Sequence, residues 1–98
     1  MPQVFVGNDR KYFSWLIDHS QGFVVNTRRQ PDGDYMVLHR ATCSSINHYS
    51  SAAKPGGFTE RNYIKICSDD VRALREWVWT HGRADGSFST ECSLCKPI

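Results

Sequence analysis

The sequence lacks the features that mark membrane-spanning, secreted or disordered chains. No apolar run within its 98 residues approaches the roughly 18 residues that a membrane span requires. The first residues, Met1–Val6, contain no basic stretch followed by a long apolar run, so we expect no signal peptide and a cytoplasmic location. Internal repeats and low-complexity tracts are absent as well. The chain is therefore expected to fold as a single domain over residues 1–98.

A large excess of one charge is also missing. The formal net charge is only +2, so the chain has no general basic field of the kind that nucleic-acid-binding domains often carry. Any contact with nucleic acid would have to come from a local group of basic residues. A chain of this length buries only a modest fraction of its surface, so a bound metal ion would add usefully to its stability.

The sequence contains four cysteines, two of which are separated by only two residues. In a reducing compartment, the four cysteines are interpreted as metal ligands, whereas in a secreted chain two disulfides would be the alternative. Cys92 and Cys95 form a C-x-x-C pair, and the following Pro97 prevents a helix from continuing there. The pair therefore predicts a tight turn that directs two thiols at one metal ion.

Two further ligands are needed for a tetrahedral zinc site, and His39 with Cys43 supplies them four residues apart. The predicted Zn²⁺ ligands are thus His39, Cys43, Cys92 and Cys95. An all-thiolate site with Cys67 in place of His39 is the alternative. We favour His39, because it has Cys43 as a local partner and Cys67 has none. Four protein ligands close the coordination sphere, which indicates a structural zinc.

A catalytic metal would instead keep one position open and place a carboxylate such as Glu91 beside it. The patterns H-x-E and H-E-x-x-H do not occur in the sequence, so we do not expect an enzyme. A redox dithiol is also disfavoured, because reactive C-x-x-C pairs usually begin a helix and this one is followed by Pro97.

Hydrophobic periodicity predicts an α+β fold with two helices. The first covers Asp9–His19, with Trp15 on its flank and a core face of Tyr12, Phe13, Leu16 and Ile17. The second begins with Ser68 as its N-cap and ends at Gly82. Trp79 lies off the core face of that second helix.

Alternating residues predict a small antiparallel sheet of three or four strands. The expected strands cover residues 22–27, 35–39 and 63–67, with a short one at 4–6. On the strand at 63–67, Ile64 and Ile66 should point to one face and Cys67 to the other. The nineteen residues from Ser44 to Asn62 have no clear periodicity and predict a long loop.

The two metal motifs resemble those of the Ada-type zinc domain of bacterial DNA-repair regulators. That resemblance rests on His39-x-x-x-Cys43 and on the ending Cys92-x-x-Cys95-Lys96-Pro97. It implies zinc, a small α+β fold and contact with DNA. His39 stands where that family has the cysteine that accepts a methyl group, so the repair reaction should be absent. The stretch GFVVN at residues 22–26 and the strand end VLHR at 37–40, followed by Cys43, are also similar to small bacterial modules associated with restriction or defence, which implies an accessory of a larger system.

Scattered basic and aromatic residues predict where nucleic acid would bind. The candidate contacts are Arg28, Arg29, Arg40, Lys54, Arg61 and Tyr49. Phe58 lies among them and would add a second stacking ring. The alternative function is a structural zinc module that binds a protein partner through the long loop and Trp79.

Overall fold

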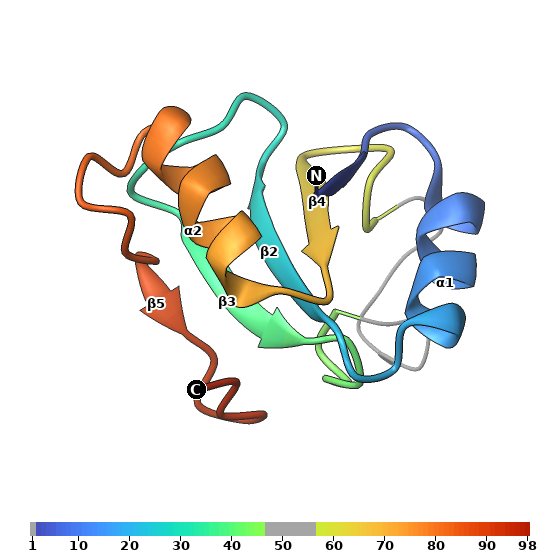
Figure 1. Ribbon diagram of the computed structural model, residues 1–98. Helices are drawn as coiled ribbons and strands as arrows, with labels where there is room; N and C mark the ends of the chain where they lie inside the picture. Colours follow the sequence, from blue (N-terminus) through green and yellow to red (C-terminus); the bar gives the residue numbers. More distant parts are fainter. Residues whose placement is uncertain (1, 47–56) are drawn as a thin grey trace.

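The computed structural model describes residues 2–46 and 57–98, which form an α+β fold. Its strands are β1 (Gln3–Phe5), β2 (Phe23–Arg28), β3 (Met36–Arg40), β4 (Tyr63–Ser68) and β5 (Thr90–Glu91). They form one sheet in the order β1-β4-β2-β3-β5, and helices α1 (Asp9–Asp18) and α2 (Val71–Thr80) flank it (Figure 1). Neither helix is long and apolar enough to cross a membrane.

The sheet has five strands and is mixed, so the prediction of three or four antiparallel strands was wrong in detail. Its fifth strand, β5, runs parallel to β3, whereas the other neighbours are antiparallel. The backbone N–H groups of Ser89 and Cys92 hold β5 in place by donating to the carbonyls of Met36 and Leu38, each at 2.9 Å. A strand of two residues is too short to show alternation in a sequence.

Two hydrophobic clusters lie on the two faces of the sheet. As predicted, Ile64 and Ile66 lie in one cluster, which also contains Leu74 and Val78 of α2. Cys67 lies in the other, which contains Tyr12 and other residues of α1. Each helix therefore covers its own face of the sheet.

The core face of α1 differs from the prediction at two positions. Trp15 is buried, while Ile17 is 69% exposed. Ile17 lies about 100° around the helix from Leu16, which turns it toward solvent. The ring of Trp15 fits because residue 22 is glycine, where a Cβ atom would lie only 2.7 Å from Trp15 Cη2.

The start of α2 also differs from the prediction. Asp70 is its N-cap, with a side chain that accepts a hydrogen bond from the backbone N–H of Arg72 at 2.9 Å. Ser68 instead ends β4, and its hydroxyl accepts from the N–H of Asp70 at 3.0 Å. A serine and two aspartates in sequence are all good caps, so composition alone could not choose among them.

Buried polar side chains hold the chain on both sides of residues 47–56. Before this stretch, the Tyr12 hydroxyl donates to the carbonyl of Ile46. After it, the Lys65 ammonium donates to the carbonyl of Phe58 at 2.7 Å and to Asn26 Oδ1 at 2.8 Å. Phe58 is buried against Tyr12, so its predicted role as an exposed stacking ring was wrong.

Candidate metal centre and basic pocket

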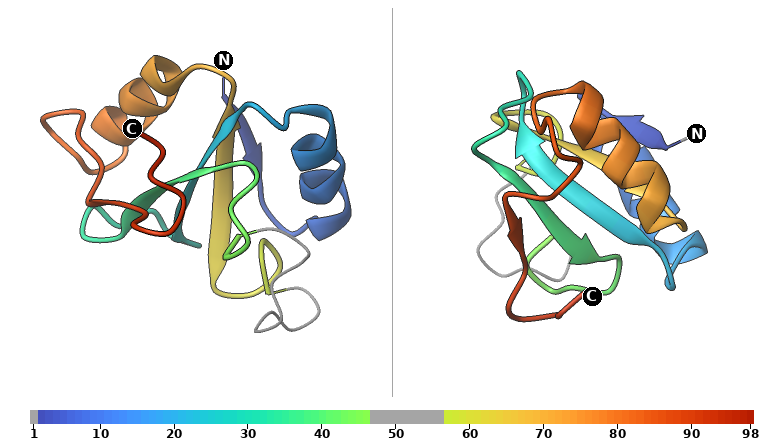
Figure 2. Two further views of the ribbon diagram at one scale, coloured as in Figure 1. Left: turned by 90° about the horizontal axis from the view of Figure 1, so that it is seen from below. Right: turned by 60° about the vertical axis from the view of Figure 1, so that its left-hand side comes forward.

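Four predicted ligands meet at one end of the sheet, which we call the cysteine end. Their ligand atoms, from His39, Cys43, Cys92 and Cys95, all lie within 4.8 Å of one another. The C-terminal segment that carries two of them lies beside the end of β3 (Figure 2). The Sγ atoms of Cys43 and Cys92 are 3.9 Å apart. Tetrahedral zinc with Zn–S bonds of about 2.3 Å places two sulfurs about 3.8 Å apart, so this group fits a zinc ion.

Backbone hydrogen bonds form the turn that carries Cys92 and Cys95. The N–H of Cys92 donates to the Leu38 carbonyl and extends the β3–β5 pairing, and the N–H of Lys96 donates back to the Cys92 carbonyl, each at 2.9 Å. Lys96 has a φ of 46°, in the left-handed region that closes tight turns. The C-x-x-C motif is therefore fixed to the sheet by its first residue.

Arg40 lies at the cysteine end, where it contacts the C-terminal turn. Its backbone N–H donates to Cys95 Sγ at 3.2 Å. Its guanidinium group donates to the carbonyls of Cys95 and Lys96, each at 3.0 Å. Its hydrogen-bonding groups thus hold the turn, a role that the sequence did not reveal.

The ionisation of His39 and Cys92 suits metal binding, whereas burial raises the pKa of Cys95 to about 11. Burial, with a smaller contribution from the Lys65 ammonium, lowers the pKa of His39 to about 4, so its imidazole is neutral near pH 7. The neutral ring is the form that binds a metal ion. Burial alone would raise the pKa of Cys92, but hydrogen bonds from the N–H groups of Cys95 and Leu94 outweigh it and the net pKa is lowered. Those N–H groups favour the thiolate, which is the ligand form of cysteine.

Cys67, the alternative ligand, lies outside this group. Val24 pairs with His39 on one side and with Cys67 on the other, so the two candidates are separated by two strand spacings, about 10 Å. Cys67 is fully buried in the cluster beneath α1, and burial raises the pKa of its thiol well above the usual range. All four cysteines are free of disulfides. Glu91, the carboxylate considered for catalysis, is exposed and is not part of the group.

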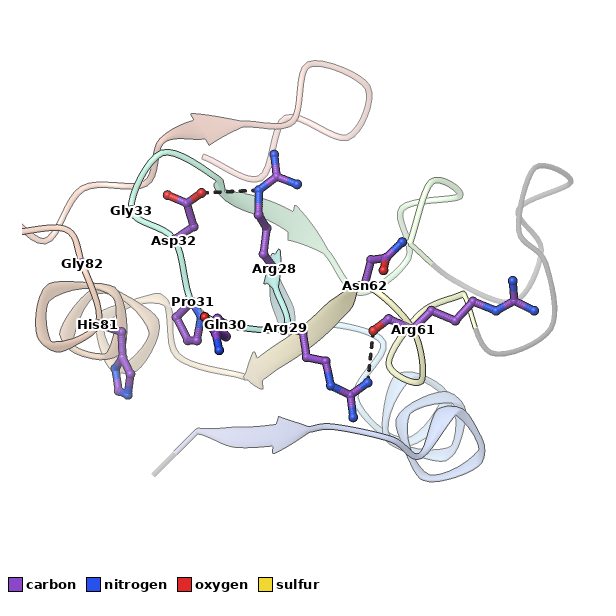
Figure 3. Close-up of a pocket in the computed structure, with 10 residues that line it drawn as sticks. All are labelled: Arg28, Arg29, Gln30, Pro31, Asp32, Gly33, Arg61, Asn62, His81 and Gly82. Atoms are coloured by element: carbon purple, nitrogen blue, oxygen red, sulfur yellow. Dashed lines mark hydrogen bonds and ion pairs between the residues drawn. The ribbon is translucent and has the colours of Figure 1, made fainter.

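Three predicted nucleic-acid contacts lie at the opposite end of the sheet, which we call the arginine end. Arg28, Arg29 and Arg61 line a pocket of about 700 Å³ there (Figure 3). The complete lining is Arg28, Arg29, Gln30, Pro31, Asp32, Gly33, Arg61, Asn62, His81 and Gly82. Tyr49 and Lys54 lie outside the described residues. The predicted basic surface is therefore divided, because Arg40 is at the cysteine end.

The pocket is positively charged, since the described residues that line it supply three guanidinium groups and one carboxylate. That carboxylate, Asp32, forms an ion pair with Arg28 at 3.4 Å. Arg29 donates to the carbonyl oxygen of Arg61 at 3.1 Å, which links the two segments that frame the pocket. The three guanidinium groups point in different directions (Figure 3), so they do not converge on one point.

Comparisons with protein families, with characterised proteins and with solved structures found no match for this chain. The resemblance to Ada-type domains and to bacterial defence modules therefore stays a prediction.

Proposed function

We propose that this chain is a non-catalytic zinc-binding module that recognises nucleic acid, with DNA as the expected ligand. The zinc part rests on one observation, the four ligand atoms that lie within 4.8 Å of one another. Four protein ligands would leave no coordination position for a reacting water. His39, Cys43 and Cys92 are also buried, which is typical of a structural site.

The nucleic-acid part is supported by the arginine end of the sheet. Guanidinium groups bind phosphate through paired hydrogen bonds. Three of them line one pocket, with Arg28 at the end of β2 and Arg29 and Arg61 just outside the strands, while a zinc ion would stabilise the other end of the sheet. In this division of roles, the metal stabilises the fold and the arginines make the contacts. The resemblance to Ada-type domains predicts the same kind of ligand.

A gel-shift titration with single- and double-stranded DNA tests this proposal. If Arg28, Arg29 and Arg61 each contact a phosphate, affinity should fall about 20- to 40-fold from about 50 to about 200 mM salt. Replacing Arg29 or Arg61 with glutamine should weaken binding and reduce this salt dependence. Arg72→Gln is the matched control, since that side chain is 89% exposed and lies on α2, outside the pocket. Zinc-loaded protein that binds no probe would contradict the proposal.

A protein partner is the second candidate, and Trp79 favours it. As predicted, Trp79 lies off the core face of α2, and it is 59% exposed. It lines a groove of about 290 Å³ together with Arg75, Glu76, Ala84, Asp85 and Gly86. A pull-down with nuclease-treated extract, in wild-type and Trp79→Ala forms, tests this role. A protein that the wild type captures and the Trp79→Ala form does not would support the partner role. Identical capture by both forms would contradict it.

A further inference from the structure

Two tyrosines flank Arg28 at the arginine end of the sheet. Tyr63 of β4 pairs directly with Arg28 of β2, and Tyr35 lies immediately before β3. The Tyr35 and Tyr63 rings are 5.8 Å apart between centroids and tilted by 40°. The Arg28 guanidinium carbon lies 5.0 Å from the centre of the Tyr35 ring. We call Tyr35, Arg28 and Tyr63 the aromatic row.

Strand alternation places the aromatic row on a defined face of the sheet. Tyr63 and Lys65 are two residues apart in β4, so both point to the face that carries α1. The Lys65 ammonium lies 5.6 Å from the Tyr63 ring and adds positive charge beneath it. Both tyrosines are half-buried, so each ring keeps part of its surface accessible. The row is therefore a partly exposed, positively charged aromatic surface.

Arg28 belongs to both this row and the basic pocket, which makes the two surfaces continuous. Aromatic pairs across strands often serve only to stabilise a sheet. Here Arg28 lies over one ring of the pair and also lines the pocket that Arg29 and Arg61 line, and that combination matches a strand of nucleic acid, whose phosphates are negative and whose bases have flat faces. In a duplex those faces are already stacked on each other, whereas in a single strand they are available.

We propose that Tyr35 and Tyr63 stack against unpaired bases, with Arg28, Arg29 and Arg61 on the adjacent phosphates. The ligand of the module is then single-stranded nucleic acid. This inference rests on the proposed nucleic-acid function and specifies its ligand. It also assigns Asp32 a role, because its carboxylate competes with phosphate for Arg28.

Fluorescence anisotropy with a labelled oligothymidine of about twelve nucleotides, its RNA counterpart and a duplex of equal length tests the inference. The single strands should bind more tightly than the duplex. Tyr35→Leu and Tyr63→Leu should each weaken single-strand binding about tenfold or more, which corresponds to the loss of one stacked base. Tyr35→Phe and Tyr63→Phe keep the ring and should bind within about twofold of wild type. Asp32→Asn, which retains an acceptor for the N–H of Asp34, should strengthen binding.

Photochemical cross-linking provides a readout on the unaltered protein, so it does not depend on how the leucine variants fold. An iodouracil-substituted single strand should cross-link to peptides that contain Tyr35 or Tyr63. Cross-links found only elsewhere, tighter binding of the duplex, or leucine variants equal to the phenylalanine variants would overturn the stacking inference and leave nucleic-acid binding in place. Binding of none of the probes by the wild-type protein would instead reject both proposals.

Discussion

Removing zinc from this protein should destabilise it by an amount that can be worked out from the structure. The ion would connect Cys43 to Cys92, which are 49 positions apart. A cross-link of that span removes about 4 kcal/mol of chain entropy from the unfolded state. For a domain of this size, each kcal/mol shifts the melting temperature by about 4–8 °C. Excess chelator should therefore lower the melting temperature by about 15–30 °C.

Thermal unfolding followed by circular dichroism, with one equivalent of zinc or with chelator, measures this shift. His39→Ala and Cys43→Ser should melt near the chelated wild type with or without zinc, because each removes one of the four ligands. Cys67→Ala is the matched control. It removes a buried thiol from the core, so both of its melting temperatures should fall while the difference between them remains.

Two results would refute this reasoning. The first is reduced protein that contains no zinc and whose melting temperature changes by less than about 3 °C with chelator, since the cross-link would then contribute less than about 1 kcal/mol. The second is a zinc-dependent shift that Cys67→Ala removes and His39→Ala leaves intact, which would make the all-thiolate site correct.

Three further predictions concern the buried thiols, Lys65 and a pair of glycines. In chelator-treated protein near pH 7, iodoacetamide should modify Cys92 early, because its pKa is lowered, and Cys67 last, because its pKa is raised by burial. Mass spectrometry over time shows the order, and early modification of Cys67 would contradict it. Burial lowers the pKa of Lys65 to about 8 from its ordinary 10.5. Between these two pH values, the unfolded chain holds a proton that the folded chain lacks. The free energy of unfolding of wild type relative to Lys65→Met should thus rise with pH across this range, by up to about 3 kcal/mol, in denaturant titrations. A difference in unfolding free energy between wild type and Lys65→Met that stays constant with pH would contradict this prediction. Gly33→Ala should lower stability by about 1–3 kcal/mol, because its Cβ would lie 2.3 Å from the Gly82 carbonyl oxygen. An unchanged melting temperature would contradict that contact.

The parts of the fold that could be predicted are those that depend on local patterns. Helix α1 and strands β2–β4 follow from periodicity, and the opposite orientations of Ile66 and Cys67 follow from strand alternation. The grouping of the four metal ligands was also predictable, because two short motifs each contributed two ligands. Proximity in the sequence served as a guide to proximity in space.

Features that depend on distant contacts could not be predicted in the same way. Pairing of β5 with β3 requires knowing that the C-terminal segment returns to the sheet. The burial of Trp15 depends on the missing side chain at Gly22. The hydrogen bonds from the Arg40 guanidinium group to the carbonyls of Cys95 and Lys96 likewise join residues 55 and 56 positions apart.

The hydrogen bonds at Ile46 and Phe58 have a practical consequence for protein engineering. Tyr12 and Lys65 tie these two residues to the core. Because each of them has its own hydrogen bond to a buried side chain, changes to the sequence between them should transmit little strain to Cys43 or to the sheet. Residues 47–56 are therefore the natural position for grafting a foreign peptide or a reporter while both ends of the domain keep their geometry.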